Sequence, residues 1–285
     1  MKKSKVFLAF GALVVVAAVG AGIIAVMHRG EEGASRLVVT AYAASTKSTK
    51  SVKSAVAKES PAEVAVRAAA ARKRHIFVTF YKKGDALSGK MLAAIKSVQG
   101  KLSSRASFTS ADVGNPIHQT LIKRYGVDSA PIPLTLVLAP NGAVTAGFPR
   151  EIKTADLSGV FASNGLASVL KVVQDGKLAA VCIQSAKTRF NKESLAAAEG
   201  LESDSRLSGS VGVVRINPAD QSELRFLQQC KVDVNGANAQ ILLIVPPGRV
   251  VGKFDGDTTK DKLMAALQSA LSSCGTGCAP SGCGP

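Results

Sequence analysis

Apolar positions along the chain follow two spacings, one typical of buried strands and the other of amphipathic helices. They predict helices at 60–73, 91–102 and 116–125, strands at 76–81 and 107–113, and a hairpin of strands 134–138 and 144–148. Ser60, Pro61 and Glu63 form a capping box that marks the start of the first helix. This order of elements predicts an α/β fold with a mixed sheet.

The same order of elements returns 103 to 106 residues later in the chain. Residues 75–91 match 178–194, residues 125–128 match 230–233, and residues 134–150 match 240–257. The second copy has predicted helices at 166–174, 192–201, 221–230 and 259–271, and strands at 178–183, 211–216, 241–245 and 250–254. A nearly constant offset is typical of two copies of one domain. We therefore expect tandem domains over residues 60–162 and 163–272.

An apolar run without any charge, Val6 to Met27, precedes both domains. As a helix it would be about 33 Å long, enough to cross a hydrocarbon core of ~30 Å. Three lysines among the first five residues favour a cytoplasmic N-terminus. Residues 1–27 thus predict a single-pass transmembrane anchor, with the domains in the periplasm. The alternative is secretion after signal cleavage, because Ala41-Tyr42-Ala43 resembles a cleavage site, although the apolar run is longer than in most signal peptides.

The formal net charge of +16 is concentrated near the N-terminal side of the first domain. Residues 28–59 predict a basic, flexible linker, rich in Ser, Thr and Lys towards its end. The chain has no Trp and only three Tyr to stack on bases, and the anchor removes it from the usual compartment of nucleic acids. We therefore expect the linker to lie near anionic lipid headgroups, and we expect no nucleic-acid partner.

Two stretches, Phe77–Met91 and Tyr125–Gly142, resemble the thioredoxin-like family, whose layout fits residues 60–272 twice. In that family a Cys-x-x-Cys loop begins the helix after the first central strand. The corresponding loop here is degenerate: it has Asp85 and Ser88 at the cysteine positions, and the second copy has Thr188–Asn191. The resemblance therefore implies two tandem thioredoxin-like domains, both without the dithiol. We expect Asp85 to cap the following helix instead.

The family's cis-proline, which precedes the strand entering the hairpin, has two candidates in the first copy. Pro131 has the expected spacing from Tyr125, whereas Pro133 better suits the distance to Gly142. The resemblance implies one of these two prolines without selecting between them. The second copy has Ala237-Asn238-Ala239 in this region and no proline.

The loop from Gly84 to Met91 also approaches a phosphate-binding pattern. It matches G-x-x-x-x-G-K followed by Met91, where that pattern requires Ser or Thr. Methionine supplies no hydroxyl for a magnesium ion, and no clean apolar strand ending in a metal-binding aspartate follows. We do not expect the chain to bind nucleotide.

Five cysteines fall into two groups. Cys182 and Cys230 lie in a predicted strand and at a predicted helix end, where burial is expected. Cys274, Cys278 and Cys283 belong to a Gly- and Pro-rich tail over residues 273–285. Three thiols in such a tail suit Cu(I) or Zn(II) binding, one disulfide, or thiol exchange with a partner. No Ser/His/Asp set is evident.

Two hypotheses for function follow. The first is a membrane-anchored scaffold that binds a protein partner in the cell envelope and is not an enzyme. The second is a thiol–disulfide oxidoreductase, or a protein that handles copper or zinc, working through Cys274, Cys278 and Cys283.

Overall fold

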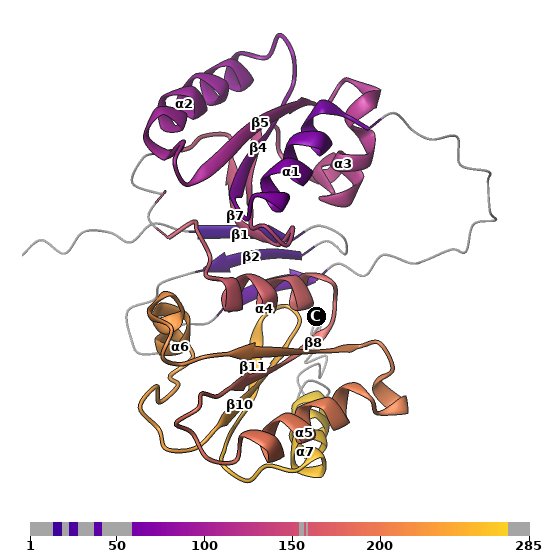
Figure 1. Cartoon of the computed structure of the whole chain (residues 1–285). Coiled ribbons are helices and arrows are strands. Elements are labelled where there is room, and N and C mark those ends of the chain that lie inside the picture. The colour runs from indigo at the N-terminus through magenta and orange to yellow at the C-terminus, as the bar shows by residue number, and fades with distance from the viewer. Residues whose placement is uncertain are drawn as a thin grey trace, which may run out of the picture.

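The computed structural model describes residues 59–153, 157 and 159–272, together with three N-terminal strands, β1 (Val14–Ala18), β2 (Ile23–Met27) and β3 (Leu37–Ala41). Two α/β domains follow these strands, and in Figure 1 they lie one above the other. This architecture confirms the predicted α/β class and the predicted internal repeat.

The first domain is built around four strands. Its elements are α1 (Pro61–Ala71), β4 (His75–Tyr81), α2 (Ala86–Leu102), β5 (Ala106–Asp112), α3 (Gln119–Arg124), β6 (Leu134–Leu138) and β7 (Val144–Pro149), with short 3₁₀ turns at Pro116–His118 and Val127–Ser129. β4 pairs with β5 in parallel and with β6 antiparallel, and β7 pairs antiparallel with β6. The strand order is therefore β7-β6-β4-β5.

The second domain repeats this topology. Its elements are α4 (Asn164–Gln174), β8 (Leu178–Ile183), α5 (Asn191–Glu202), β9 (Val211–Ile216), α6 (Leu224–Gln229), β10 (Gln240–Val245), β11 (Arg249–Asp255) and α7 (Lys260–Ser272), with 3₁₀ turns at Ser205–Leu207 and Gln221–Glu223. β8 pairs with β9 in parallel and with β10 antiparallel, and β10 pairs with β11. The order β11-β10-β8-β9 matches that of the first domain strand for strand.

Each sheet is covered on both faces, which explains the continuous apolar runs in its central strands. In β4, Ile76, Val78 and Phe80 pack into a core with α1 and α3, whereas Phe77 packs on the other face with Met91 of α2. The second domain has the same two-sided arrangement around β8 and β10. Helices α1 and α2 therefore lie on opposite faces of the first sheet.

The N-terminal apolar run contains strands where the sequence predicts a transmembrane helix. β1 pairs with β2, β2 pairs with β3, and β1 joins the edge of β7 through Val15 and Gly147. Runs of Val and Ile are compatible with this outcome because their branched side chains favour strands. Among the described residues, no helix is long and apolar enough to cross a membrane. The other residues of the run Val6–Met27 and most of the proposed cleavage site lie outside the described part of the chain.

Helix α4 of the second domain packs against the β6–β7 hairpin of the first domain. Ala139 and Ala143 at the β6–β7 turn pack against Ala167 of α4. The Asn141 amide donates a hydrogen bond to the Ala167 carbonyl at 2.8 Å. Small side chains on both surfaces allow this close approach of helix and turn.

Candidate functional site

The loop between β4 and α2 occupies the place at which the resemblance stated above would put a dithiol. Asp85 is the N-cap of α2, and its Oδ2 accepts a hydrogen bond from the Ser88 backbone N–H at 2.7 Å. Ser88 is 1% exposed, and its Oγ accepts from the Lys82 backbone N–H at 3.1 Å. The hydrogen bonds from Ser88, first from its backbone and then from its hydroxyl, lower the pKa of Asp85. As predicted, Asp85 caps the helix, and Ser88 holds the loop.

The cis peptide bond of the first domain lies between Ile132 and Pro133. It is thus Pro133, rather than Pro131, that takes this conformation and leads into β6. Phe80 of β4 pairs with Leu134 of β6. Pro133, just before β6, and the loop that follows Tyr81, at the end of β4, consequently lie at the same end of these two paired strands.

The equivalent loop of the second domain is closed by its own hydrogen bonds. Thr188 Oγ1 lies 2.6 Å from Asn191 Oδ1, and Asn191 Nδ2 donates to the Ser185 carbonyl at 2.7 Å. Arg189 pairs in parallel with Asn238: its N–H donates to the Ala237 carbonyl, and its carbonyl accepts from the Ala239 N–H. The backbone N–H and carbonyl of Arg189 in this loop are therefore already hydrogen-bonded to other residues of the chain.

One large apolar side chain is exposed at each of the two helix starts, on the second residue of α2 and on the N-cap of α5. Leu87 is 47% exposed in the first domain, and Phe190, which is 103 residues later, is 38% exposed in the second. Phe190 also has a positive φ of 62°, which is unusual for a bulky residue. Two loops without a dithiol thus present apolar groups to their surroundings.

Both cysteines in the described part of the chain are free and unsuited to nucleophilic chemistry. Cys182 is in the middle of β8 and fully buried, and Cys230 caps the end of α6 and is partly buried. Burial raises the pKa of each thiol to about 11. Cys274, Cys278 and Cys283 lie outside the described residues. Within the described ranges no cluster of His, Cys, Asp or Glu could hold a metal ion.

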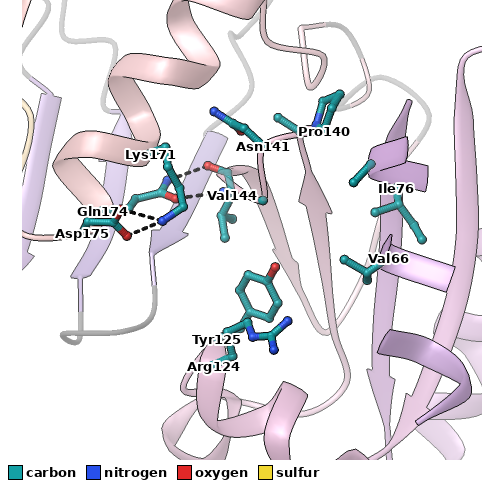
Figure 2. A pocket seen from close by; sticks show the side chains of 13 residues that line it. Val66, Ile76, Arg124, Tyr125, Pro140, Asn141, Val144, Lys171, Gln174 and Asp175 are labelled. Carbon is teal, nitrogen blue, oxygen red and sulfur yellow. Dashed lines mark hydrogen bonds and ion pairs between the residues drawn. The ribbon is translucent and has the colours of Figure 1, made fainter. Parts of the chain in front are cut away.

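A cavity of about 390 Å³ lies between the two domains (Figure 2). The first domain contributes α1, the start of β4, the end of α3 and the hairpin turn, and the second contributes α4. Its lining residues are Val66, Ala70, Ile76, Arg124, Tyr125, Ala139, Pro140, Asn141, Gly142, Val144, Lys171, Gln174 and Asp175. Sequence reasoning missed this site because apolar spacing describes each domain by itself and carries no signal for how two domains dock.

Neither a protein-family model nor a curated protein matches the chain. Solved structures to which it is similar include the germline-specific thioredoxin Deadhead from Drosophila melanogaster, at 26% identity over 30% of this chain and 78% of that one, with a TM-score of 0.26. The N-terminal domain of alkylhydroperoxide reductase AhpF from Enterococcus faecalis is 16% identical over 71% of this chain and 95% of that one, with a TM-score of 0.26. The first two thioredoxin domains of Saccharomyces cerevisiae Eps1p are 12% identical over 73% and 94%, with a TM-score of 0.24.

The topology of each domain identifies its fold. A parallel β–α–β unit is followed by a helix and an antiparallel hairpin, whose first strand pairs with the first strand of the unit. Together with the helices on both faces of each sheet, this is a thioredoxin-like fold, present twice in tandem.

Proposed function

We propose that this chain is a tandem thioredoxin-like binding protein that holds a protein partner and carries out no dithiol exchange with its two domains. One observation carries the proposal. At the start of α2, the oxygens of Asp85 and Ser88 accept hydrogen bonds from backbone N–H groups of the same loop. Both side chains therefore stabilise the loop, and neither can form a disulfide.

The apolar side chains of the two loops support a binding role. Leu87 lies in the first turn of α2 and Phe190 at the N-cap of α5, and both are large exposed apolar residues. Large apolar side chains that are exposed at the surface are suited to contact with a protein partner, which would remove them from water. We propose that the partner contacts the two loops through Leu87 and Phe190.

Photo-crosslinking in native membranes tests this contact. With benzoylphenylalanine in place of Leu87 or Phe190, we expect a discrete cross-linked product at each position. Val64 on α1 and Val250 on β11 are matched controls, because both are exposed apolar residues outside the loops. Equal cross-linking at all four positions would contradict a defined partner contact.

The rival function is thiol exchange or metal handling by the tail. Three cysteines, Cys274, Cys278 and Cys283, lie within the last twelve residues. The other two, Cys182 and Cys230, are buried or partly buried in the second domain. Insulin reduction separates the two functions. We expect the full chain to show no activity above background, and a triple Cys→Ser variant of the tail to behave identically. Activity that the triple variant loses would overturn the binding proposal, as would stoichiometric Cu(I) or Zn(II) in the purified chain.

The proposal includes a place in the cell envelope, which rests on the sequence pattern alone. A run of 22 uncharged residues, Val6–Met27, follows a lysine-rich start. Alkaline carbonate extraction of membranes tests the anchor. Retention in the pellet supports it, whereas release of the full-length chain contradicts it and favours a soluble β1–β3 sheet.

A further inference from the structure

The cavity between the domains has the size of a small-molecule site. Its volume of about 390 Å³ falls within the roughly 300–1,000 Å³ that ligand pockets commonly occupy. Because α4 of the second domain forms one wall and α1, β4 and α3 of the first domain form the others, a bound molecule would touch both domains. This position is separate from the two loops discussed above.

Several side chains of the lining are apolar. Val66 and Ala70 come from α1, Ile76 from β4, and Ala139 and Val144 from the hairpin. These side chains offer no hydrogen-bonding group. They are suited to a hydrocarbon or aromatic body, because its burial removes apolar surface from water.

Most polar groups of the lining are already engaged. Gln174 uses both polar atoms on the Val144 main chain, at 2.9 and 2.7 Å. Asn141 binds the Ala167 carbonyl and the Ala143 N–H, and Lys171 forms an ion pair with Asp175. These groups shape the cavity but have little capacity left for a ligand.

Tyr125 has an unused donor that reaches the cavity. Its side chain is 6% exposed, and its hydroxyl makes no hydrogen bond with any described residue. Figure 2 shows the ring projecting into the space between the end of α3 and Val144. A Cβ on Gly142 would lie 3.9 Å from this hydroxyl, so the hairpin turn passes within van der Waals distance of it.

Arg124, beside it in sequence, also retains donor capacity. The nearest carboxylate is that of Glu63, with 3.8 Å between Arg124 Nη2 and Glu63 Oε1. The other Glu63 oxygen accepts from the Ser60 N–H at 3.0 Å as part of the α1 capping box. The Arg124 guanidinium is thus weakly paired, and in Figure 2 it lies beside the ring of Tyr125.

We propose that the cavity binds a small carboxylic acid with an apolar body. The carboxylate would accept hydrogen bonds from Tyr125 Oη and the Arg124 guanidinium, and the body would lie on Val66, Ala70 and Ile76. The unpaired Tyr125 hydroxyl and the weakly paired Arg124 guanidinium favour an anion over a cation, because Asp175, the one acidic side chain of the lining, is already paired with Lys171. Arginine is well suited to a carboxylate because its planar fork can donate two parallel hydrogen bonds.

Saturation-transfer NMR on the full chain in lipid nanodiscs tests the site, with empty nanodiscs as the reference. Phenylacetate is the acidic probe, and 2-phenylacetamide is its neutral match. We expect saturable binding of phenylacetate, and binding of the amide weaker by about 10-fold, the ratio typical of losing one charged hydrogen bond. The absence of saturable phenylacetate binding up to millimolar concentration would overturn the proposal, and so would equal affinity for acid and amide.

Four variants assign the binding to this cavity. Tyr125→Phe and Arg124→Gln remove the two donors and should each weaken phenylacetate binding by about 5- to 10-fold. Ala70→Leu fills space beside the apolar side chains of the lining and should abolish binding. Lys123→Gln is the matched control, because this exposed neighbour makes the same charge change outside the cavity and should leave affinity within about 2-fold. An equal loss in Lys123→Gln and Arg124→Gln would mean non-specific attraction and would contradict the site.

Discussion

Gln174, the last residue of α4, binds both main-chain groups of Val144, the first residue of β7. Its Oε1 accepts from the Val144 N–H at 2.9 Å, and its Nε2 donates to the Val144 carbonyl at 2.7 Å. A side-chain amide of the second domain thereby pairs with the first domain as a neighbouring strand would. Val144 is 1% exposed, so these two groups have little access to water.

Gln174→Ala should therefore destabilise the contact between the domains. The Val144 N–H and carbonyl lose their partners, which costs about 1–3 kcal/mol for a buried group. Guanidinium denaturation followed by circular dichroism measures the change in the free energy of unfolding. Gln228→Ala, at an exposed position on α6, is the control and should stay within about 0.5 kcal/mol. Equal stability of the two variants would show that the Gln174 contact contributes nothing.

Introducing cysteines in place of Asp85 and Ser88 should create a functional dithiol at the start of α2. Asp85 is the N-cap and Ser88 lies three residues further into α2, so Asp85→Cys with Ser88→Cys places two thiols at a helix start, where the first thiol's pKa is lowered. We expect the double variant, made with the tail cysteines changed to Ser, to form a disulfide and to reduce insulin. The measurements are intact mass before and after reduction and the turbidity of reduced insulin.

The matched control for this gain is Asp85→Cys alone, which has one thiol in the loop and cannot close a disulfide there. Failure of the double variant to oxidise would mean that the loop geometry differs from that of a dithiol domain.

Cys182 and Cys230 should resist alkylation in the folded chain. Burial raises the pKa of both thiols to about 11, so at pH 8 roughly one in a thousand is ionised, about 10²-fold fewer than for an exposed thiol. Iodoacetamide labelling followed by peptide mass spectrometry should modify these two residues only after guanidinium is added. Rapid labelling of Cys182 in the native chain would contradict its fully buried position in β8.

Lys73→Gly should stabilise the first domain although it removes a side chain. Lys73 follows the last turn of α1 with a φ of 53°, and the Arg74 N–H donates to the Ala69 carbonyl at 3.0 Å, which is the pattern of a Schellman ending. Glycine favours this left-handed conformation, so we expect a gain of about 0.5–1 kcal/mol. Lys177→Gly is the control: Lys177 has no positive φ, and glycine there should lower stability or leave it unchanged. Thermal unfolding of both variants decides the sign.

The sequence pattern was sufficient for the elements that are determined locally. Ser60 and Glu63 form the capping box that their spacing predicts, Asp85 caps α2, and Cys182 is buried in a strand. In each case the controlling interaction joins residues three or four apart or follows from the apolar spacing of one strand. The repeat offset added the prediction of two similar sheets, which the strand orders confirm.

Features that depend on contacts between residues far apart in the sequence could not be predicted from the sequence pattern. Spacing left Pro131 and Pro133 as equal candidates, because the choice depends on how the loop meets β4. The contact between Gln174 and Val144 joins residues 30 apart in two domains. The Val- and Ile-rich segments of β1 and β2 satisfy the composition of a membrane helix and of a strand alike, so apolar content alone could not separate the two.

The docking of the segment that joins the domains should depend on pH through His75. The His75 ring packs edge-on against Phe161 with 5.2 Å between centroids, and its Nε2 is buried without a partner among the described residues. Burial, with a smaller contribution from the positive charge of Arg105, lowers the pKa of His75 below its usual value of about 6.5. The folded chain therefore binds its proton less readily than the unfolded chain. Stability should be highest above pH 6.5 and should fall as the pH drops through 6.5 towards the lower folded-state pKa.

His75→Phe should remove this dependence while keeping an aromatic ring against Phe161. We expect the thermal midpoint of the wild-type chain to fall more between pH 7.5 and pH 5.0 than that of the variant. The difference between the two pH profiles isolates His75, because the other titrating groups are common to both proteins. Parallel profiles would contradict a lowered pKa and would mean that the His75 ring is open to water in solution.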